Sequence, residues 1–191
     1  MPGSPRIWFA TSNDHKFEEG RFILQELGII PHRLPSKGQE LQSSDTSDVA
    51  VHAAVETYRV FRKPLFVEDT GLFIDSLRGF PGTSASFVFQ TLGLGGILKL
   101  LDGVDTRSAE FVSSVAYYDG SSKPRVFTGR LEGSLALRPR GLGGFGFDPV
   151  FVPGGARRTL AQMTLAEKCT ISHRASALRG FGRWLSLTRN W

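Results

Sequence analysis

The chain has 191 residues, with 40% hydrophobic and 21% charged residues, which is ordinary for a soluble globular protein that buries a full core. No apolar run approaches the ~20 residues of a membrane span, and residues 1–6 lead into no signal-peptide core, so we expect no membrane partner. A single cysteine, Cys169, excludes an internal disulfide framework and a cysteine-based zinc cluster, and a cytoplasmic location is the default expectation.

The formal net charge of +5 favours an anionic partner. The basic residues are scattered, with no run longer than Arg157-Arg158. A small molecule that carries phosphate is therefore as plausible a partner as nucleic acid.

The first predicted elements are a strand over residues 7–10 and a helix that stops at Gly28. The first turn of this helix carries His15 and Lys16, and cations there oppose the helix macrodipole. An anion gripped by free N–H groups and Lys16 would remove the conflict, although the sequence is neither a Walker loop nor a dinucleotide loop. The alternative is that Lys16 simply points to water.

A short edge strand over residues 29–34 and a polar loop over residues 36–47, which holds Glu40, come next. The apolar stripe of residues 51–61 predicts a second helix, and Pro64 ends it.

In the segment of residues 65–73, an apolar run over residues 65–67 leads into Glu68, Asp69, Thr70 and Gly71. The run predicts a strand buried on both faces, after which Gly71 lets the backbone turn. A carboxylate at the end of such a strand can hold Mg²⁺ or take a proton from an attacking water. The alternative is a solvated turn after a core strand.

The middle of the chain differs in its predicted elements from the first part. A tight loop at residues 79–82 precedes two short predicted helices, at 84–91 and 97–101. Alternation over residues 111–118, and again over residues 126–137, predicts an antiparallel lobe beside the first α/β lobe.

A glycine-rich segment at residues 141–146 leads into Phe145, Gly146, Phe147 and Asp148. Glycine is tolerated where backbone must approach a ligand closely. One phenylalanine would stack on a ligand ring while the other faces the core. The alternative is a core hairpin with a flexible corner.

Two helix starts lie near the C-terminus. Thr164-x-x-Glu167 is a capping box, with Lys168 just inside the helix, and Ser172 caps a final helix whose first turn contains His173 and Arg174. Cations crowd a helix start for the second time, which points to an anionic ligand.

These motifs together resemble the inosine/xanthosine triphosphate pyrophosphatases over roughly residues 6–187. The resemblance rests on Thr11-Ser12-Asn13-x-x-Lys16, Glu68-Asp69-Thr70-Gly71-Leu72, Gly79-Phe80-Pro81-Gly82, Gly144-Phe145-Gly146-Phe147-Asp148-Pro149 and Glu167-Lys168-x-x-Ile171-Ser172-His173-Arg174. It implies a mixed α/β fold of two lobes around a long central sheet, one domain over residues 1–191 with no separable linker, and a substrate cleft between the lobes. It also implies Mg²⁺-dependent hydrolysis of non-canonical purine nucleoside triphosphates to monophosphate and pyrophosphate, and a homodimer.

The resemblance further implies roles for individual residues. Asp69 would be the general base and a metal ligand, and Glu40 the second metal ligand, with Glu68 assisting. The triphosphate would be held by Thr11, Ser12, Asn13, Asp14, His15 and Lys16, with Thr70 beside them. The base would lie against Phe145, Gly146, Phe147 and Asp148, and its edge would face Lys168, His173 and Arg174.

The chain departs from the usual family pattern at four positions. Ser12 stands in place of a glycine, Thr70 of a serine, Val55 of a lysine and Ser86 of an arginine. Because Val55 and Ser86 replace basic residues, they put the binding of the triphosphate in doubt. A nucleic-acid-binding protein remains an alternative, although no basic run or basic helix supports it and we expect no nucleic-acid partner. A closer alternative is a pyrophosphatase that prefers modified pyrimidine or canonical triphosphates.

Overall fold

The computed structural model describes residues 6–36, 41–121 and 123–188. Glu40, the expected second metal ligand, lies outside these residues. The elements in chain order are β1 (Trp8–Ala10), α1 (Asp14–Gln25), β2 (His32–Leu34), α2 (Thr46–Phe61), β3 (Leu65–Ile74), η1 (Asp75–Leu77), β4 (Pro81–Gly82), α3 (Ala85–Leu100), β5 (Ser108–Tyr118), β6 (Arg125–Leu135), β7 (Phe151–Pro153), η2 (Leu160–Gln162), α4 (Leu165–Ile171) and α5 (His173–Thr188).

One mixed sheet organises the chain, with the strand order β2-β1-β3-β5-β6-β7 and β4 paired to β3. β1 runs parallel to β2 and β3, and the remaining pairs are antiparallel. The expected mixed α/β fold is confirmed. One local prediction is wrong, because β2 begins at His32 rather than residue 29. The expected pair of short helices is confirmed, because a kink at Gly93, which has φ 64° and ψ −171°, divides α3 into two helical parts.

The central strand β3 is longer than the sequence indicated. It continues through Gly71 to Ile74 and pairs with β5 along its whole length, so the turn predicted at Gly71 is wrong. On its other edge, β1 pairs only with residues 65–66 and β4 only with residues 72–73. The edge of β3 is therefore not paired with a strand between residues 67 and 71, where the two carboxylates lie.

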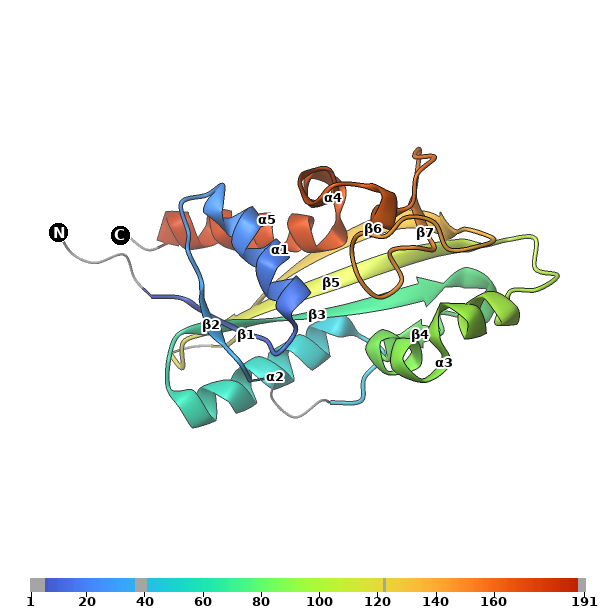
Figure 1. Cartoon of the computed structure of the whole chain (residues 1–191). Helices are drawn as coiled ribbons and strands as arrows, with labels where there is room; N and C mark the ends of the chain where they lie inside the picture. Colours follow the sequence, from blue (N-terminus) through green and yellow to red (C-terminus); the bar gives the residue numbers. More distant parts are fainter. Residues whose placement is uncertain (1–5, 37–40, 122, 189–191) are drawn as a thin grey trace.

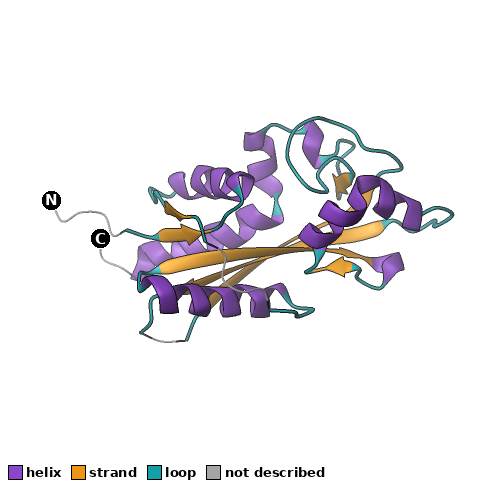
Figure 2. Cartoon of the chain, turned by 60° about the horizontal axis from the view of Figure 1, so that its bottom comes forward, coloured by secondary structure: helices purple, strands orange, loops and turns teal. Residues whose placement is uncertain are grey.

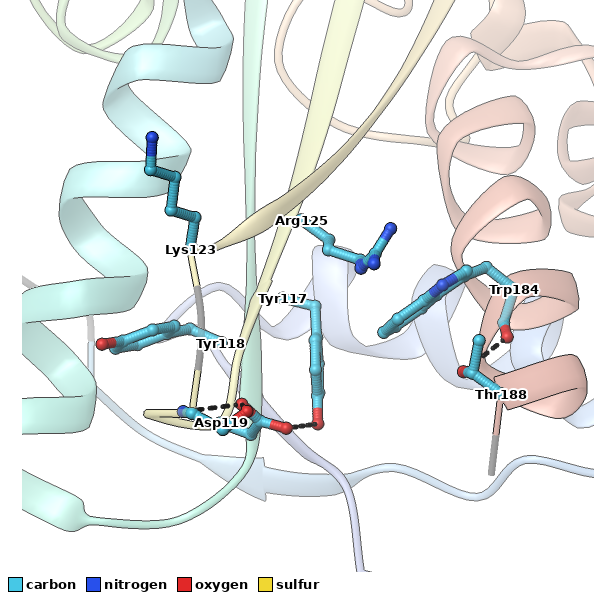
Figure 3. A pocket seen from close by; sticks show the side chains of 8 residues that line it. Tyr117, Tyr118, Asp119, Lys123, Arg125, Trp184 and Thr188 are labelled. Atoms are coloured by element: carbon cyan, nitrogen blue, oxygen red, sulfur yellow. Dashed lines mark hydrogen bonds between the residues drawn. The ribbon is translucent and has the colours of Figure 1, made fainter. Parts of the chain in front are cut away.

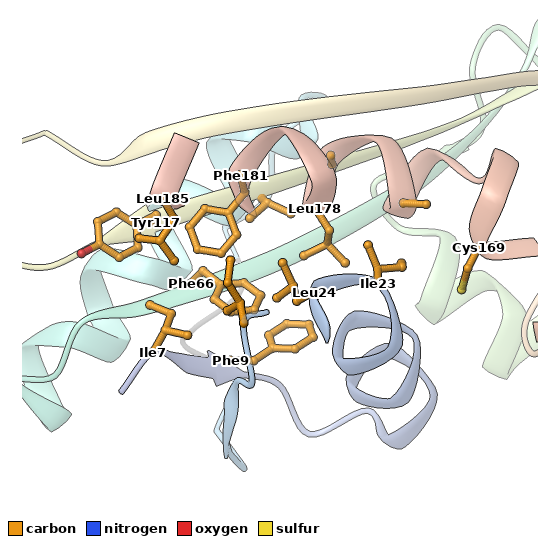
Figure 4. Close-up of a cluster of buried hydrophobic side chains, with 14 residues drawn as sticks. Ile7, Phe9, Ile23, Leu24, Phe66, Tyr117, Cys169, Leu178, Phe181 and Leu185 are labelled. Carbon is orange, nitrogen blue, oxygen red and sulfur yellow. The ribbon is translucent and has the colours of Figure 1, made fainter. Parts of the chain in front are cut away.

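Helices cover both faces of the sheet (Figures 1 and 2). α1, α4 and α5 lie on one face, and α2 and α3 on the other. Beneath α1 and α5, the rings of Phe9, Phe66 and Phe181 pack in the core cluster of Figure 4, where Phe9 and Phe66 stack with centroids 4.4 Å apart. Leu65 and Val67 point the other way and pack under α2. Successive side chains of β3 thus alternate between the two helical layers.

The start of α5 lies directly on the sheet because β6 carries Gly129. A Cβ atom at Gly129 would lie 2.1 Å from the carbonyl oxygen of His173 and 2.7 Å from the amide nitrogen of Ala177. Only a residue without a side chain allows this approach. Gly129 also stands opposite Ser113 in the β5–β6 register, so it fixes the first turn of α5 above the middle of the sheet.

Within the described residues, no helix is both long and apolar enough to cross a membrane.

Candidate active site

A cleft of about 530 Å³ opens along the unpaired edge of β3. The turn before α1, the first turns of α3 and α5, one face of α2 and the glycine-rich loop surround it. Of the residues predicted for the site, it is lined by Thr11, Ser12, Asn13, His15, Lys16, Asp69, Thr70, Phe145, Gly146, Phe147, Asp148, His173 and Arg174. Asp14 and Lys168 do not line it.

Two positions at which the chain departs from the family pattern, Ser86 and Val55, differ in whether they line this cleft. Ser86, on the first turn of α3, lines it. Val55 does not, and the α2 side chains that face the cleft are those of Val49 and Ala53. The surface that α2 presents to a ligand is therefore apolar.

The turn between β1 and α1 is built around Asn13. The side chain of Asn13 accepts a hydrogen bond from the backbone N–H of Lys16 at 3.1 Å, which caps the helix. The ammonium of Lys16 lies 3.2 Å from the carbonyl oxygen of Glu68 and 2.9 Å from its Oε2. Lys16 thus points across the cleft to β3 rather than into solvent. Asp14 points outward, with 75% of its side chain exposed.

Glu68 and Asp69 point to opposite faces of the sheet, as neighbours on a strand must. Glu68 lies on the α1 and α5 side, where Ser113 donates to its Oε1 at 2.6 Å and Arg174 Nε lies 3.2 Å away. Burial alone would raise the pKa of Glu68, but Arg174 and Lys16 outweigh it and hold the pKa well below its usual range. Glu68 is therefore ionised and forms ion pairs with both Lys16 and Arg174.

Asp69 lies on the α2 side of β3, half-buried at the cleft wall. Its partner in the β3–β5 register is Ser114, whose hydroxyl lies 2.8 Å from that of Thr46 at the start of α2. The described residues contain no group of three or more His, Cys, Asp or Glu side chains that could hold a metal ion. Mg²⁺ is commonly held by one or two carboxylates together with substrate phosphates, and Asp69 suits that kind of site.

Sequence reasoning missed Glu19, which is buried in the middle of the ion-pair network. Its carboxylate pairs with Lys168 at 2.7 Å and with Arg174, and Lys168 also pairs with Asp148. Burial would raise the pKa of Glu19, but Arg174 and Lys168 outweigh it, and the net pKa is lowered. The one available signal was an acid next to Gly20 on the apolar face of α1, since Gly20, Ile23 and Leu24 are buried with it.

The glycine-rich loop wraps around Asp148. Gly144 has φ +68°, and a Cβ there would lie 2.2 Å from Asp148 Oδ2, so this position requires glycine on two grounds. The same oxygen accepts the backbone N–H of Phe145 at 2.8 Å. The flexible-corner alternative is therefore wrong, because the loop is held in one place by a buried carboxylate.

The two phenylalanines divide as expected. Phe147 is buried and meets Phe89 edge-on in the core, with ring centroids 5.5 Å apart. Phe145 is half-buried at the cleft, where the Lys168 ammonium lies 4.8 Å and the Arg174 Cζ 5.3 Å from its ring centroid. Lys168 thus supports the wall of the cleft from behind.

His173 is the first residue of α5 and is buried against the sheet. Its ring stacks on Phe111 with centroids 4.5 Å apart, and its Nδ1 has no hydrogen-bond partner among the described residues. Burial, reinforced by Arg174, lowers the pKa of His173 well below its usual range, so the ring is neutral near pH 7. A neutral imidazole at the cleft wall, with a ring nitrogen that has no partner among the described residues, is suited to form a hydrogen bond with a polar atom of a ligand.

A second, smaller hollow of about 240 Å³ lies at the turn between β5 and β6 (Figure 3). Arg125 Cζ there lies 5.1 Å from the ring centroid of Trp184, and Tyr117 donates to Asp119 at 3.2 Å. None of the predicted site residues lines this hollow. Cys169 is unreactive, because burial raises the pKa of its thiol to about 12.

The chain is similar to known proteins over most of its length. The chain is 46% identical over 180 residues to the dITP/XTP pyrophosphatase of Thermococcus kodakarensis, covering 94% of this chain and 97% of that protein. It is 44% identical over 179 residues to the dITP/XTP pyrophosphatase of Methanopyrus kandleri, covering 94% and 95%. Among solved structures, a HAM1 protein from Coxiella burnetii matches with a TM-score of 0.83 at 28% identity, over 97% of this chain and 100% of that chain. Residues 7–184 match the Ham1 family, and the chain belongs to that family.

Proposed function

We propose that the protein hydrolyses non-canonical purine nucleoside triphosphates, such as those of inosine and xanthosine and the deoxy form of inosine, to the monophosphate and pyrophosphate. One observation carries this proposal. A single cleft brings together a capped helix start with Lys16, the Asp69 carboxylate and the Phe145 ring, which suit a phosphate chain, a water nucleophile and a base respectively. Relatives named dITP/XTP pyrophosphatases support the same substrate class.

The bond that breaks joins the α-phosphorus to the oxygen that bridges to the β-phosphate. The turn at residues 11–16 would hold the phosphates through backbone N–H groups and Lys16. Asp69 would orient a water molecule and take its proton, the water oxygen would bond to the α-phosphorus, and pyrophosphate would leave with the bridging oxygen. Positioning and electrostatic stabilisation supply most of the catalysis in such reactions.

Mg²⁺ is proposed as the cofactor, held by Asp69, by the substrate phosphates and by Glu40. When bound, it would neutralise charge on the triphosphate and on the leaving pyrophosphate. The support from this chain is the half-buried Asp69 carboxylate at the cleft wall, opposite Ser114 in the sheet.

Selection of the base would take place at Phe145 and His173. Phe145 would stack on the purine ring, and a donor on His173 would meet the 6-oxo oxygen, where adenine presents an amino group. A site whose donors stay unpaired with the wrong base can discriminate by ~10⁴-fold. Lys168 and Asp148 would act through Phe145, whose position they fix.

We also propose a homodimer that works in the cytoplasm, on the free nucleotide pool. The support for a partner copy is a set of exposed apolar side chains on and beside α3, namely Phe80, Phe87, Leu92 and Leu100. Light scattering on the purified chain would test the dimer, and a monomer at micromolar concentration would contradict it.

Product analysis tests the proposed reaction. The purified chain is incubated with Mg²⁺ and a panel of inosine, xanthosine, guanosine, adenosine, cytidine and modified pyrimidine triphosphates, and pyrophosphate and monophosphate are quantified. We expect the highest kcat/KM for inosine and xanthosine triphosphates. Release of inorganic phosphate instead of pyrophosphate would contradict the bond assignment, and a pyrimidine preference would favour the alternative pyrophosphatase.

A further inference from the structure

Arg33 on β2 lies behind the turn that leads into α1 and contacts Thr11, Ser12 and Asp14 there. Its Nη2 donates to the carbonyl oxygen of Ser12 at 3.0 Å and its Nε to that of Thr11 at 3.4 Å. Its Nη1 forms an ion pair with Asp14, and its Cζ lies 5.6 Å from the ring centroid of Phe17. Arg33 does not line the cleft, so it contacts the turn and not the space inside it.

These contacts control the direction of the backbone dipoles in the turn. A carbonyl oxygen that faces a phosphate repels it, whereas N–H groups attract it. The carbonyls of Thr11 and Ser12 point to the guanidinium, and the N–H of Thr11 donates to the Leu34 carbonyl of β2 at 3.0 Å. The turn is therefore held to β2 from behind.

The carbonyl contacts matter more than the ion pair. Asp14 is 75% exposed and the Arg33 side chain 33% exposed, and an ion pair this open to solvent contributes little. The two carbonyl bonds use the planar fork of the guanidinium, which an ammonium cannot reproduce.

We propose that Arg33 is a positioning residue for phosphate binding: it holds the carbonyls of Thr11 and Ser12 away from the cleft and keeps Lys16 and the first N–H groups of α1 directed at the phosphates. The inference rests on the proposed function of that turn. It concerns how the turn is held, not which nucleotide is cleaved.

The test compares ligands with and without phosphate. In the variant Arg33→Ala we expect KM for inosine triphosphate to rise at least ~10-fold, the scale of one lost charge-assisted hydrogen bond, with a smaller change in kcat. The affinity for pyrophosphate, measured by calorimetry, should fall by a similar factor. The inhibition constant of inosine, which carries no phosphate, should stay the same. Arg33→Lys should recover part of the loss, because an ammonium can bind one of the two carbonyls.

Arg59→Ala is the matched control, since Arg59 is an exposed arginine paired with Glu56 on α2 and its removal deletes the same charge. We expect no change in that variant. Equal weakening of inosine and pyrophosphate in Arg33→Ala would overturn the proposal, and so would unchanged pyrophosphate affinity. If Arg33→Ala does not fold, Arg33→Lys and Arg33→Gln carry the same comparison. Pyrophosphate binding tests Arg33 even if the parent cleaves a different nucleotide, so the two proposals fail separately.

Discussion

The imidazole ring of His15 lies flat on the phenyl ring of Phe145, with centroids 5.1 Å apart and planes inclined by 9°. Rings this close are in direct contact and leave no space for a third ring between them. The other groups against Phe145 are the buried cations Lys168 and Arg174, which are fixed by Glu19. His15 is exposed, so its side chain is the one that moves away when a base stacks on Phe145.

The variant His15→Ala should therefore bind inosine monophosphate more tightly. Stacked aromatic pairs contribute about 0.5–1.5 kcal/mol, which corresponds to roughly 2- to 10-fold in affinity once the competing ring is removed. Inhibition constants of inosine monophosphate and of ribose 5-phosphate measure the effect, and only the former should fall. Glu18→Ala, an exposed neighbour on α1, is the control. Weaker binding of inosine monophosphate in His15→Ala would instead make His15 a second wall of the base site.

Asp69→Asn should lower kcat for inosine triphosphate by at least ~10²-fold, because the amide keeps the shape of the side chain but cannot accept a proton. Chelation of divalent cations should also abolish turnover of the parent. Asp75→Asn, which removes an exposed acid just after β3, should keep parental activity. Parental turnover by Asp69→Asn would show that the general base lies elsewhere.

Local patterns in the sequence predicted the parts of the site that depend on short-range chemistry. The capping box at Thr164 and the division between Phe145 and Phe147 follow from side chains within a few residues of each other. Gly71 was misread as a turn, because whether a strand stops at a glycine depends on its partner, and β5 supplies one as far as Ile74.

Long-range pairing accounts for what the sequence did not predict. Glu19 meets Lys168 across 149 residues of chain, and Arg33 meets Ser12 through the parallel pairing of β1 and β2. No periodicity in one segment reveals such partners. The family resemblance implied that Lys168 faces the purine edge, whereas its ammonium is buried between two carboxylates.

Glu19→Gln should destabilise the fold strongly. Removing one member of a buried ion-pair network leaves Lys168 and Arg174 with less compensation, and such changes typically cost about 3–5 kcal/mol in the free energy of unfolding. Urea denaturation at pH 7 measures this. Glu18→Gln, one residue earlier and exposed, should change the free energy of unfolding by less than about 0.5 kcal/mol. Similar midpoints for the two variants would mean that the network contributes no net stability.

Stability should also fall in acid. The pKa values of Glu19 and Glu68 are lowered in the folded state, so the unfolded chain binds protons first as the pH falls. Their stabilising contribution is complete above the ordinary carboxylate pKa of about 4.3 and is lost progressively below it. Urea denaturation between pH 6 and pH 3 should show this decline, with a shallower slope for Glu19→Gln. A parental stability that stays constant down to pH 3 would contradict the ionised network.

The preference for inosine triphosphate over adenosine triphosphate should depend on His173. Its ring is neutral near pH 7 because burial and Arg174 lower its pKa, and its Nδ1 has no partner among the described residues. A 6-oxo oxygen would accept a hydrogen bond from this ring, whereas the 6-amino group of adenine offers a second donor. His173→Phe keeps the stack on Phe111 without the polar nitrogens, and His173→Gln keeps a donor.

We expect His173→Phe to lower kcat/KM for inosine triphosphate by about 1–3 kcal/mol, or roughly 5- to 150-fold, and to change kcat/KM for adenosine triphosphate much less. The preference for inosine over adenosine should then shrink, and His173→Gln should retain part of it. Because the imidazole is already neutral, lowering the pH from 8 to 6.5 should leave the parental ratio unchanged. If the two kcat/KM values fall together in His173→Phe, His173 holds the start of α5 on the sheet and does not read the base.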